Sequence, residues 1–159
     1  MLLRRSTIVV VLLVLLAGIA AASVSAASAG SGPNLNNLKS GNGGYSVSFS
    51  GKSTGMDTSL TAKPMTTLYG SISQNQVQWT QVTIGGYTTS FSDDLYWGNP
   101  SNSLSLTVYT PDGYILGPYY SSTGNIGITI SKSNGVADGT YYFEIYGYHV
   151  IGSQSYTFT

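Results

Sequence analysis

The sequence of 159 residues has no cysteine, a single histidine and only 8% charged residues. Without cysteine, the folded part cannot rely on disulfides and must be stabilised by packing. A single histidine, His149, excludes metal sites made of several histidines, and it leaves any general-base mechanism dependent on one side chain. We interpret His149 as a solvated residue at the end of a strand.

Positive charge is also scarce beyond the N-terminus. After residue 30 there is no arginine, and four lysines stand against six acidic residues, which gives a net charge of about −2. Such a chain has no basic patch to collect phosphates. The composition therefore excludes nucleic acid as a partner. Serine, threonine, asparagine, glycine and tyrosine supply the solubility instead.

The N-terminus has the pattern of an export signal. Arg4 and Arg5 precede an uncharged run from Ile8 to Ala22, and small residues then offer cleavage sites of the Ala-x-Ala type. These sites end at Ala22, Ala26 or Ala29. We interpret residues 1–29 as a secretory signal peptide. The alternative is an uncleaved hydrophobic helix, in which case residues 8–29 attach the chain to a membrane.

Two further segments follow the signal. Residues 30–44 are rich in glycine, serine and asparagine and contain little to bury, which is typical of a flexible tether. Residues 45–159 are long enough to form one domain with a core of its own. We expect a chain located at the cell surface or in the extracellular space, or a membrane-anchored chain with an external domain if the signal is retained.

Alternating apolar residues predict short β-strands throughout this domain. The clearest is Ser103–Tyr109, in which Leu104, Leu106 and Val108 share one face. Pro-Asp-Gly at residues 111–113 then predicts a turn into a return strand. Further strands are predicted at residues 45–50, 67–73, 76–84, 87–91, 126–130, 140–148 and 155–159. Because no helical period accompanies them, we predict an all-β fold, an antiparallel β-sandwich of jelly-roll type that follows the N-terminal hydrophobic helix.

The strand predicted at residues 76–84 has a break in its alternation. Val77 and Trp79 occupy odd positions, whereas Val82 and Ile84 occupy even ones. Either a β-bulge near Thr80 shifts the register, or Trp79 faces outward.

Residues 51–55, Gly-Lys-Ser-Thr-Gly, resemble two catalytic motifs in their sequence. A nucleophile elbow needs a following helix packed on a parallel sheet, and no helical pattern follows Gly55. A phosphate loop needs a glycine five residues before Gly51, where Ser46 stands. We interpret the segment as an exposed polar turn and expect that the protein is not an enzyme.

The tyrosines indicate a binding surface. In the strand at residues 140–148, Tyr142, Glu144, Tyr146 and Tyr148 share the face opposite the apolar one, and Tyr109 lies with serine and threonine on the central strand. Tyrosine combines a flat apolar ring with a polar tip, which suits stacking on sugars or contact with a protein. These five residues are the predicted ligand site, for extracellular polysaccharide, protein or envelope components. The alternative is that the tyrosines cover a second buried face.

Three stretches give residues 66–159 a resemblance to the pre-peptidase C-terminal domain of bacteria and archaea, a family related to the collagen-binding modules of secreted collagenases. They are residues 70–84 with Trp79 near the centre, residues 94–113 with the central strand, and residues 138–148 with the sequence Gly-Thr-Tyr-Tyr near its start. The resemblance implies a small sandwich attached to exported proteins, in many cases beside a peptidase.

Some members of that family bind calcium through acidic clusters. Where the family often has aspartates beside the leucine of the central strand, this sequence has Ser103 and Ser105. Asp93, Asp94 and Asp112 remain near that strand, and Ca²⁺ takes six to eight oxygen ligands. We therefore expect no cofactor, with calcium at these three aspartates as the alternative.

The sequence thus predicts a non-catalytic, exported β-sandwich that binds or adheres at the cell surface or outside the cell. One alternative is a structural subunit of a surface layer or filament. Another is an accessory or chaperone domain for a secreted peptidase, which the family resemblance suggests.

The export prediction can be checked by intact-mass spectrometry of the protein purified from separate cell fractions. We expect a chain that begins after Ala22, Ala26 or Ala29, because signal peptidase cuts behind small residues. A full-length mass found in the membrane fraction would instead identify the uncleaved anchor.

Overall fold

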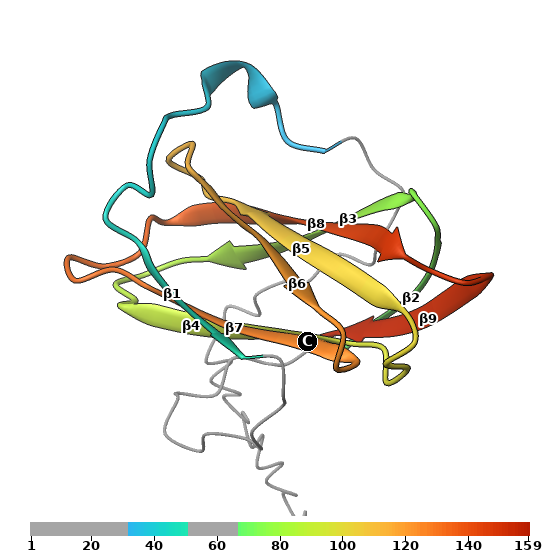
Figure 1. The fold of residues 1–159 in the computed structure, drawn as a ribbon. Coiled ribbons are helices and arrows are strands. Elements are labelled where there is room, and N and C mark those ends of the chain that lie inside the picture. The colour runs from blue at the N-terminus through green and yellow to red at the C-terminus, as the bar shows by residue number, and fades with distance from the viewer. Residues whose placement is uncertain (1–31, 51–66) are drawn as a thin grey trace, which may run out of the picture.

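The computed structural model describes residues 32–50 and 67–159, which form nine β-strands and one short 3-10 helix. The strands make two antiparallel sheets that lie one above the other (Figure 1). The elements are η1 Leu35–Asn37, β1 Ser46–Ser50, β2 Leu68–Ser73, β3 Val77–Ile84, β4 Ser90–Tyr96, β5 Ser103–Tyr109, β6 Ile115–Ser121, β7 Asn125–Ser131, β8 Gly139–His149 and β9 Ser153–Phe158. The prediction of an all-β fold made of two antiparallel sheets is confirmed.

Two of the predicted features lie outside the described residues, namely the hydrophobic helix of residues 1–29 and the polar turn at residues 51–55. Within the described ranges, no helix is long and apolar enough to cross a bilayer. The one helix there, η1, has three residues, and the side chain of Asn34 caps it by accepting a hydrogen bond from the Asn36 N–H at 3.0 Å.

The strand order is β1-β7-β4-β9-β2 in the five-stranded sheet and β3-β8-β5-β6 in the four-stranded sheet. Four of the pairs nest inside one another along the chain, because β2 pairs with β9, β3 with β8, β4 with β7 and β5 with β6. The chain from β2 to β9 is therefore one long double-stranded ribbon, whose tip is the β5–β6 turn and which is folded into two facing sheets.

The core lies between the sheets and is built from alternate residues of each strand. Leu104, Leu106 and Val108 of β5 are fully buried, as the sequence predicted. The rings of Phe143 in β8 and Phe158 in β9 join the two sheets, with centroids 4.9 Å apart. Such burial removes apolar surface from water, which is the main term that favours folding in a chain without disulfides.

The structure resolves the break in alternation in β3. Its pairing with β8 runs without a shift from Val77 opposite Tyr146 to Ile84 opposite Gly139, so there is no bulge. Thr80, Val82 and Ile84 face the core, and Trp79 faces outward. Of the two alternatives, the outward aromatic is the one observed.

One predicted strand is displaced. Residues 87–91 were expected to form a strand, whereas β4 spans Ser90–Tyr96 and pairs with β7 along its whole length. Asp93 and Asp94 therefore lie inside a strand. Pairing with a neighbouring strand outweighs the low β propensity of aspartate at these positions.

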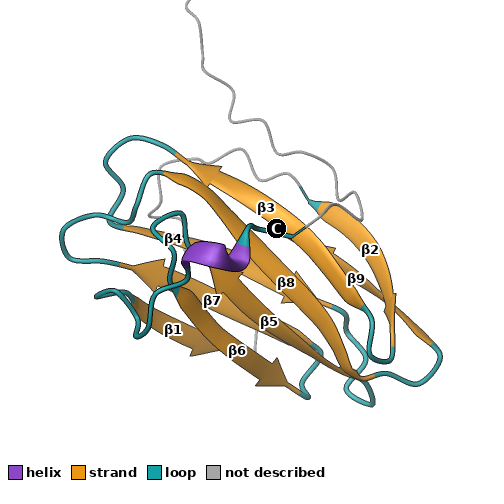
Figure 2. Ribbon diagram, turned by 90° about the horizontal axis from the view of Figure 1, so that it is seen from above, coloured by secondary structure: helices purple, strands orange, loops and turns teal. Residues whose placement is uncertain are grey.

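Residues 32–44, called here the N-terminal strap, pass over the outer face of the four-stranded sheet (Figure 2). Gly32 packs against the indole of Trp79, and the Lys39 N–H donates to the carbonyl of Gly113 at 2.9 Å. Gly113 has a φ of +92°, and a Cβ there would lie 2.9 Å from the carbonyl oxygen of Asn37. The sequence predicted a flexible tether over residues 30–44. The contacts of the strap use glycines and backbone groups, which an apolar pattern does not reveal.

The contribution of the core can be measured with two isoleucines. Ile145 is 0% exposed and Ile151 is 71% exposed. We expect Ile145→Ala to lower the free energy of unfolding by about 2–5 kcal/mol, because it leaves a cavity between the sheets. Ile151→Ala is the matched control and should change it by less than about 0.5 kcal/mol in urea unfolding. Equal losses in the two variants would contradict the described core.

Candidate functional site

The five predicted ligand residues lie together on the outer face of the four-stranded sheet. Tyr109 is opposite Tyr142 in the β5–β8 ladder, and Glu144 is opposite Trp79 in the β3–β8 ladder. Directly opposed residues share a face, so Trp79 belongs to the same surface. The sequence therefore identified a real cluster, although it did not assign Trp79 to it.

One end of this face is occupied by contacts within the chain. The Tyr109 hydroxyl donates to Glu144 Oε2 at 2.6 Å, and the Tyr109 ring lies 5.3 Å from the Trp79 ring, centroid to centroid. Burial first, and then the hydrogen bond to Glu144 and its charge, raise the pKa of Tyr109, so its hydroxyl stays protonated. Gly32 of the strap packs on Trp79. These residues already have partners.

The other end of the face is more open. Tyr148 is exposed, and its ring packs edge-to-face on the exposed ring of Tyr120, with centroids 4.9 Å apart. Tyr120 lies within β6. The Tyr146 hydroxyl donates to Asn75 Oδ1 at 2.9 Å. His149 is exposed at the end of β8, where the sequence placed it. Tyr148 is thus the most accessible residue of the predicted site, and Tyr120, which the sequence did not assign to the site, lies beside it.

The three aspartates considered for calcium do not come together. Asp93 is buried on the core side of β4, and Asp94 faces the opposite side, because adjacent residues of a strand alternate. Burial raises the pKa of Asp94. Asp112 lies on the β5–β6 turn. Among the residues that the structure describes, no three histidine, aspartate or glutamate side chains form a group that could hold a metal ion.

Asp112 is instead the centre of a hydrogen-bonded cluster at one end of the sandwich. Its Oδ1 accepts from the hydroxyls of Tyr45 at 2.8 Å and Thr110 at 2.7 Å, and its Oδ2 accepts from Lys132 Nζ at 3.1 Å. The Tyr141 hydroxyl lies 3.2 Å from that of Tyr45. Burial acts to raise the pKa of Asp112, but the hydrogen bonds from Thr110, Tyr45 and Lys132 outweigh it and lower the pKa. The carboxylate therefore joins both sheets as an ion.

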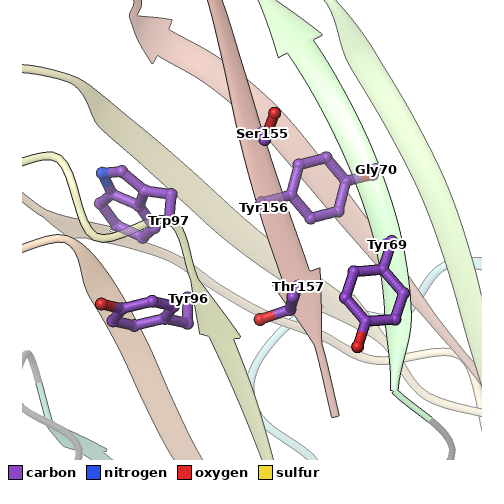
Figure 3. Close-up of a pocket in the computed structure, with 7 residues that line it drawn as sticks. All are labelled: Tyr69, Gly70, Tyr96, Trp97, Ser155, Tyr156 and Thr157. Carbon is purple, nitrogen blue, oxygen red and sulfur yellow. The ribbon is translucent and has the colours of Figure 1, made fainter.

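An open hollow of about 340 Å³ on the five-stranded sheet is a site that the sequence analysis did not identify (Figure 3). Tyr69 of β2 is opposite Thr157 of β9, and Thr157 is also opposite Tyr96 of β4. The three side chains share the outer face. Tyr69 is 77% exposed and Tyr96 is 54% exposed. Figure 3 shows the two tyrosines on either side of β9. We call this site the tyrosine hollow.

The hollow forms where β4 and β9 separate. Their ladder ends at Tyr96 and Thr157, after which the N–H groups of Trp97 and Gly98 both turn to the carbonyl of Gly124 at 2.8 Å. The side-chain amide of Gln154 occupies the gap and donates from Nε2 to the Trp97 carbonyl at 3.0 Å. The Gln154 side chain thus pairs with the Trp97 carbonyl, where a backbone bond between β4 and β9 would otherwise be expected. The gap between the two strands stays open at the surface.

Glycine shapes the far wall of the hollow. The ring of Tyr156 lies across Gly70 on the neighbouring strand, and its Oη and Cζ atoms occupy the space that a Cβ at residue 70 would need. Tyr156 is consequently buried against its neighbour and lines the site together with Trp97 and Ser155. A side chain at residue 70 would clash with the Tyr156 ring in its present position.

The lining of the tyrosine hollow is aromatic and hydroxylated. Tyr69, Tyr96, Ser155 and Thr157 supply hydroxyls, and none of the seven described lining residues is charged. Such a surface can stack on an apolar ring face and exchange hydrogen bonds with hydroxyls, but it offers no ion pair to a charged ligand. The sequence signal that could have identified it is an aromatic at the outward position of β2, next to the inward Leu68.

No model of a known protein family matches the sequence. The chain is 50% identical over 44 residues to an uncharacterized protein of Archaeoglobus fulgidus, and this stretch covers 26% of the chain and 58% of that protein. The chain therefore spans less than two thirds of the length of that relative.

Acid is expected to weaken the domain through Asp112. Its pKa is lower in the folded than in the unfolded chain, so it contributes stability above its unfolded pKa of about 4, and this is lost as pH falls through the lower folded value. Asp112→Asn should therefore be less stable than the parent at neutral pH and lose less further stability on acidification. Urea unfolding across about pH 7 to 2 measures both the stability at neutral pH and its loss on acidification.

The exposed Asp138 supplies the matched control. Asp138→Asn should keep the acid dependence of the parent protein. If Asp112→Asn kept it as well, the carboxylate would not be the group that couples protonation to unfolding.

Proposed function

We propose that the domain is a non-catalytic module, exported to the cell surface or the extracellular space, that binds carbohydrate in the tyrosine hollow. The observation that carries this proposal is the row Tyr69, Thr157 and Tyr96, in which two exposed tyrosines flank a hydroxyl on a described surface without charge. Tyrosine rings can stack on the apolar faces of pyranose rings, and the hydroxyls can pair with those of the sugar. The export signal in the sequence supports the location.

The strand pairing supports the proposal at the level of the fold. The nested pairs from β2–β9 to β5–β6 have the connectivity of a jelly roll, with β1 added beside β7. Lectin domains are among the proteins that use this architecture. A fold hosts many functions, so the proposal depends on the hollow and takes only support from the topology.

The outer face of the four-stranded sheet is the less favourable site for the same ligand. Tyr109 and Glu144 are already hydrogen-bonded to each other, and Gly32 of the strap packs on Trp79. A ligand would have to displace contacts that already exist there, at a cost in binding free energy. Tyr148 remains accessible, which makes it a useful residue for distinguishing the two faces.

A relationship with the pre-peptidase C-terminal domain is a further part of this proposal. The sequence stretches that carry the resemblance include β3, β5 and β8, which are adjacent in one sheet. If the two proteins share a fold, the similar stretches should lie next to one another in space, as β3, β8 and β5 do. A binding role beside other exported proteins would follow from such a relationship.

The proposed function can be tested with tyrosine variants of the processed protein. We expect the parent to sediment with insoluble polysaccharide, and Tyr69→Ala and Tyr96→Ala each to weaken binding roughly tenfold, equivalent to about 1.4 kcal/mol, because each removes a stacking surface. Tyr87, which is 81% exposed in the β3–β4 loop, gives the matched control Tyr87→Ala. Its binding should equal that of the parent.

Two results would contradict the proposal. One is a parent protein that binds no polysaccharide of any linkage. The other is a loss of binding with Tyr148→Ala while Tyr69→Ala and Tyr96→Ala bind normally, which would assign the ligand to the four-stranded sheet.

A further inference from the structure

We infer that the ligand of the tyrosine hollow is an extended, uncharged, β-linked glycan that crosses strands β2, β9 and β4, with alternate sugar rings stacked on Tyr69 and Tyr96. This inference rests on the proposed function and adds the linkage, the direction and the number of rings that are bound.

The direction follows from the register. Tyr69, Thr157 and Tyr96 are directly opposite one another in successive strands, so the line from one tyrosine to the other runs perpendicular to the strands. Neighbouring strands lie about 4.8 Å apart, which places the two tyrosine positions about 10 Å apart across β9. A ligand that uses both rings must therefore lie across the strands.

The linkage follows from that spacing. In an extended β-1,4-linked pyranose chain, one disaccharide repeat has nearly the same length, and every second ring presents the same face. The first and third rings of a trisaccharide can then stack on Tyr69 and Tyr96, while the middle ring lies over Thr157. An α-1,4-linked chain curves into a helix, so its first and third rings do not align with a straight row of side chains.

The surroundings of Tyr96 favour a fixed stacking surface. Its hydroxyl end lies against Gly98, where a Cβ would come within 2.9 Å of the tyrosine oxygen. A ring that is supported along one side loses little freedom when a sugar stacks on it, which reduces the entropic cost of binding. Since no described lining residue is charged, neutral units such as glucose, mannose, xylose or N-acetylglucosamine fit better than uronic acids.

The test is isothermal titration calorimetry of the processed protein with β-1,4-linked glucose and N-acetylglucosamine oligosaccharides of one to six units. We expect one step in affinity of at least roughly tenfold between the disaccharide and the trisaccharide, because the trisaccharide is the shortest chain that reaches both tyrosines. In Tyr69→Ala and in Tyr96→Ala, this step should disappear. Tyr87→Ala, the exposed control, should keep it.

The outcomes separate this inference from the proposed function. Two results would overturn the inferred linkage and spacing but leave carbohydrate binding intact. One is that α-1,4-linked glucose oligosaccharides bind with the same step in affinity. The other is that affinity for the β-linked series rises evenly with length. Failure to bind any oligosaccharide or polysaccharide would overturn both. A step confined to the β-linked series and removed by either tyrosine variant would support the inference.

Discussion

The register of the strand ladders is the constraint on which the rest of this domain depends. The nested pairs bring together residues that are far apart in sequence, and the alternation within each pair sends Leu106 and Phe143 into the core while Tyr69 and Tyr96 face solvent. A slip of one residue would exchange the two sets. Because there is no cysteine to fix the pairing covalently, the core must hold the register. The fold and the proposed binding surface therefore both depend on the register.

Both ends of the sandwich are closed by polar side chains that have partners. At one end, the ionised Asp112 joins Tyr45, Thr110 and Lys132. At the other end, Asn102 donates to Gln154 at 2.7 Å in a buried site, and Gln154 in turn donates to the Trp97 carbonyl. Buried polar groups are tolerated when they are paired in this way. The bond from Gln154 links β9 to Trp97, just beyond the end of β4, at the point where the tyrosine hollow opens.

Much of the fold could be predicted from the sequence because alternation is a local signal. The strands that contain Leu104 and Phe143 were identified with nearly their observed bounds, and the shared face of Tyr142, Glu144 and Tyr109 followed from the same period of two. The tyrosine hollow could not be predicted, because Tyr69 and Tyr96 become neighbours only when β9 enters between β2 and β4. Asp112 was considered as a calcium ligand because of the family resemblance. Its contacts to Tyr45 and Lys132 could not be predicted, because they join distant parts of the chain. The contacts of the strap have no signal in an apolar pattern, because glycines and backbone groups make them.

The outer faces of the two sheets both carry aromatic residues, but the reasons for the positions of these residues differ. Trp79 is partly buried, packs against the tilted ring of Tyr109 and contacts Gly32, so packing within the chain explains its position. Tyr69 has three quarters of its surface in water, and stability gains little from a ring that is hardly buried. Tyr69 and Tyr96 flank Thr157 in one ladder row and contribute little to the core, and the ligand that we propose accounts for their exposure. The two faces therefore differ in how much of each aromatic ring is already covered by the chain itself. This difference is the reason for proposing the ligand site on the five-stranded sheet.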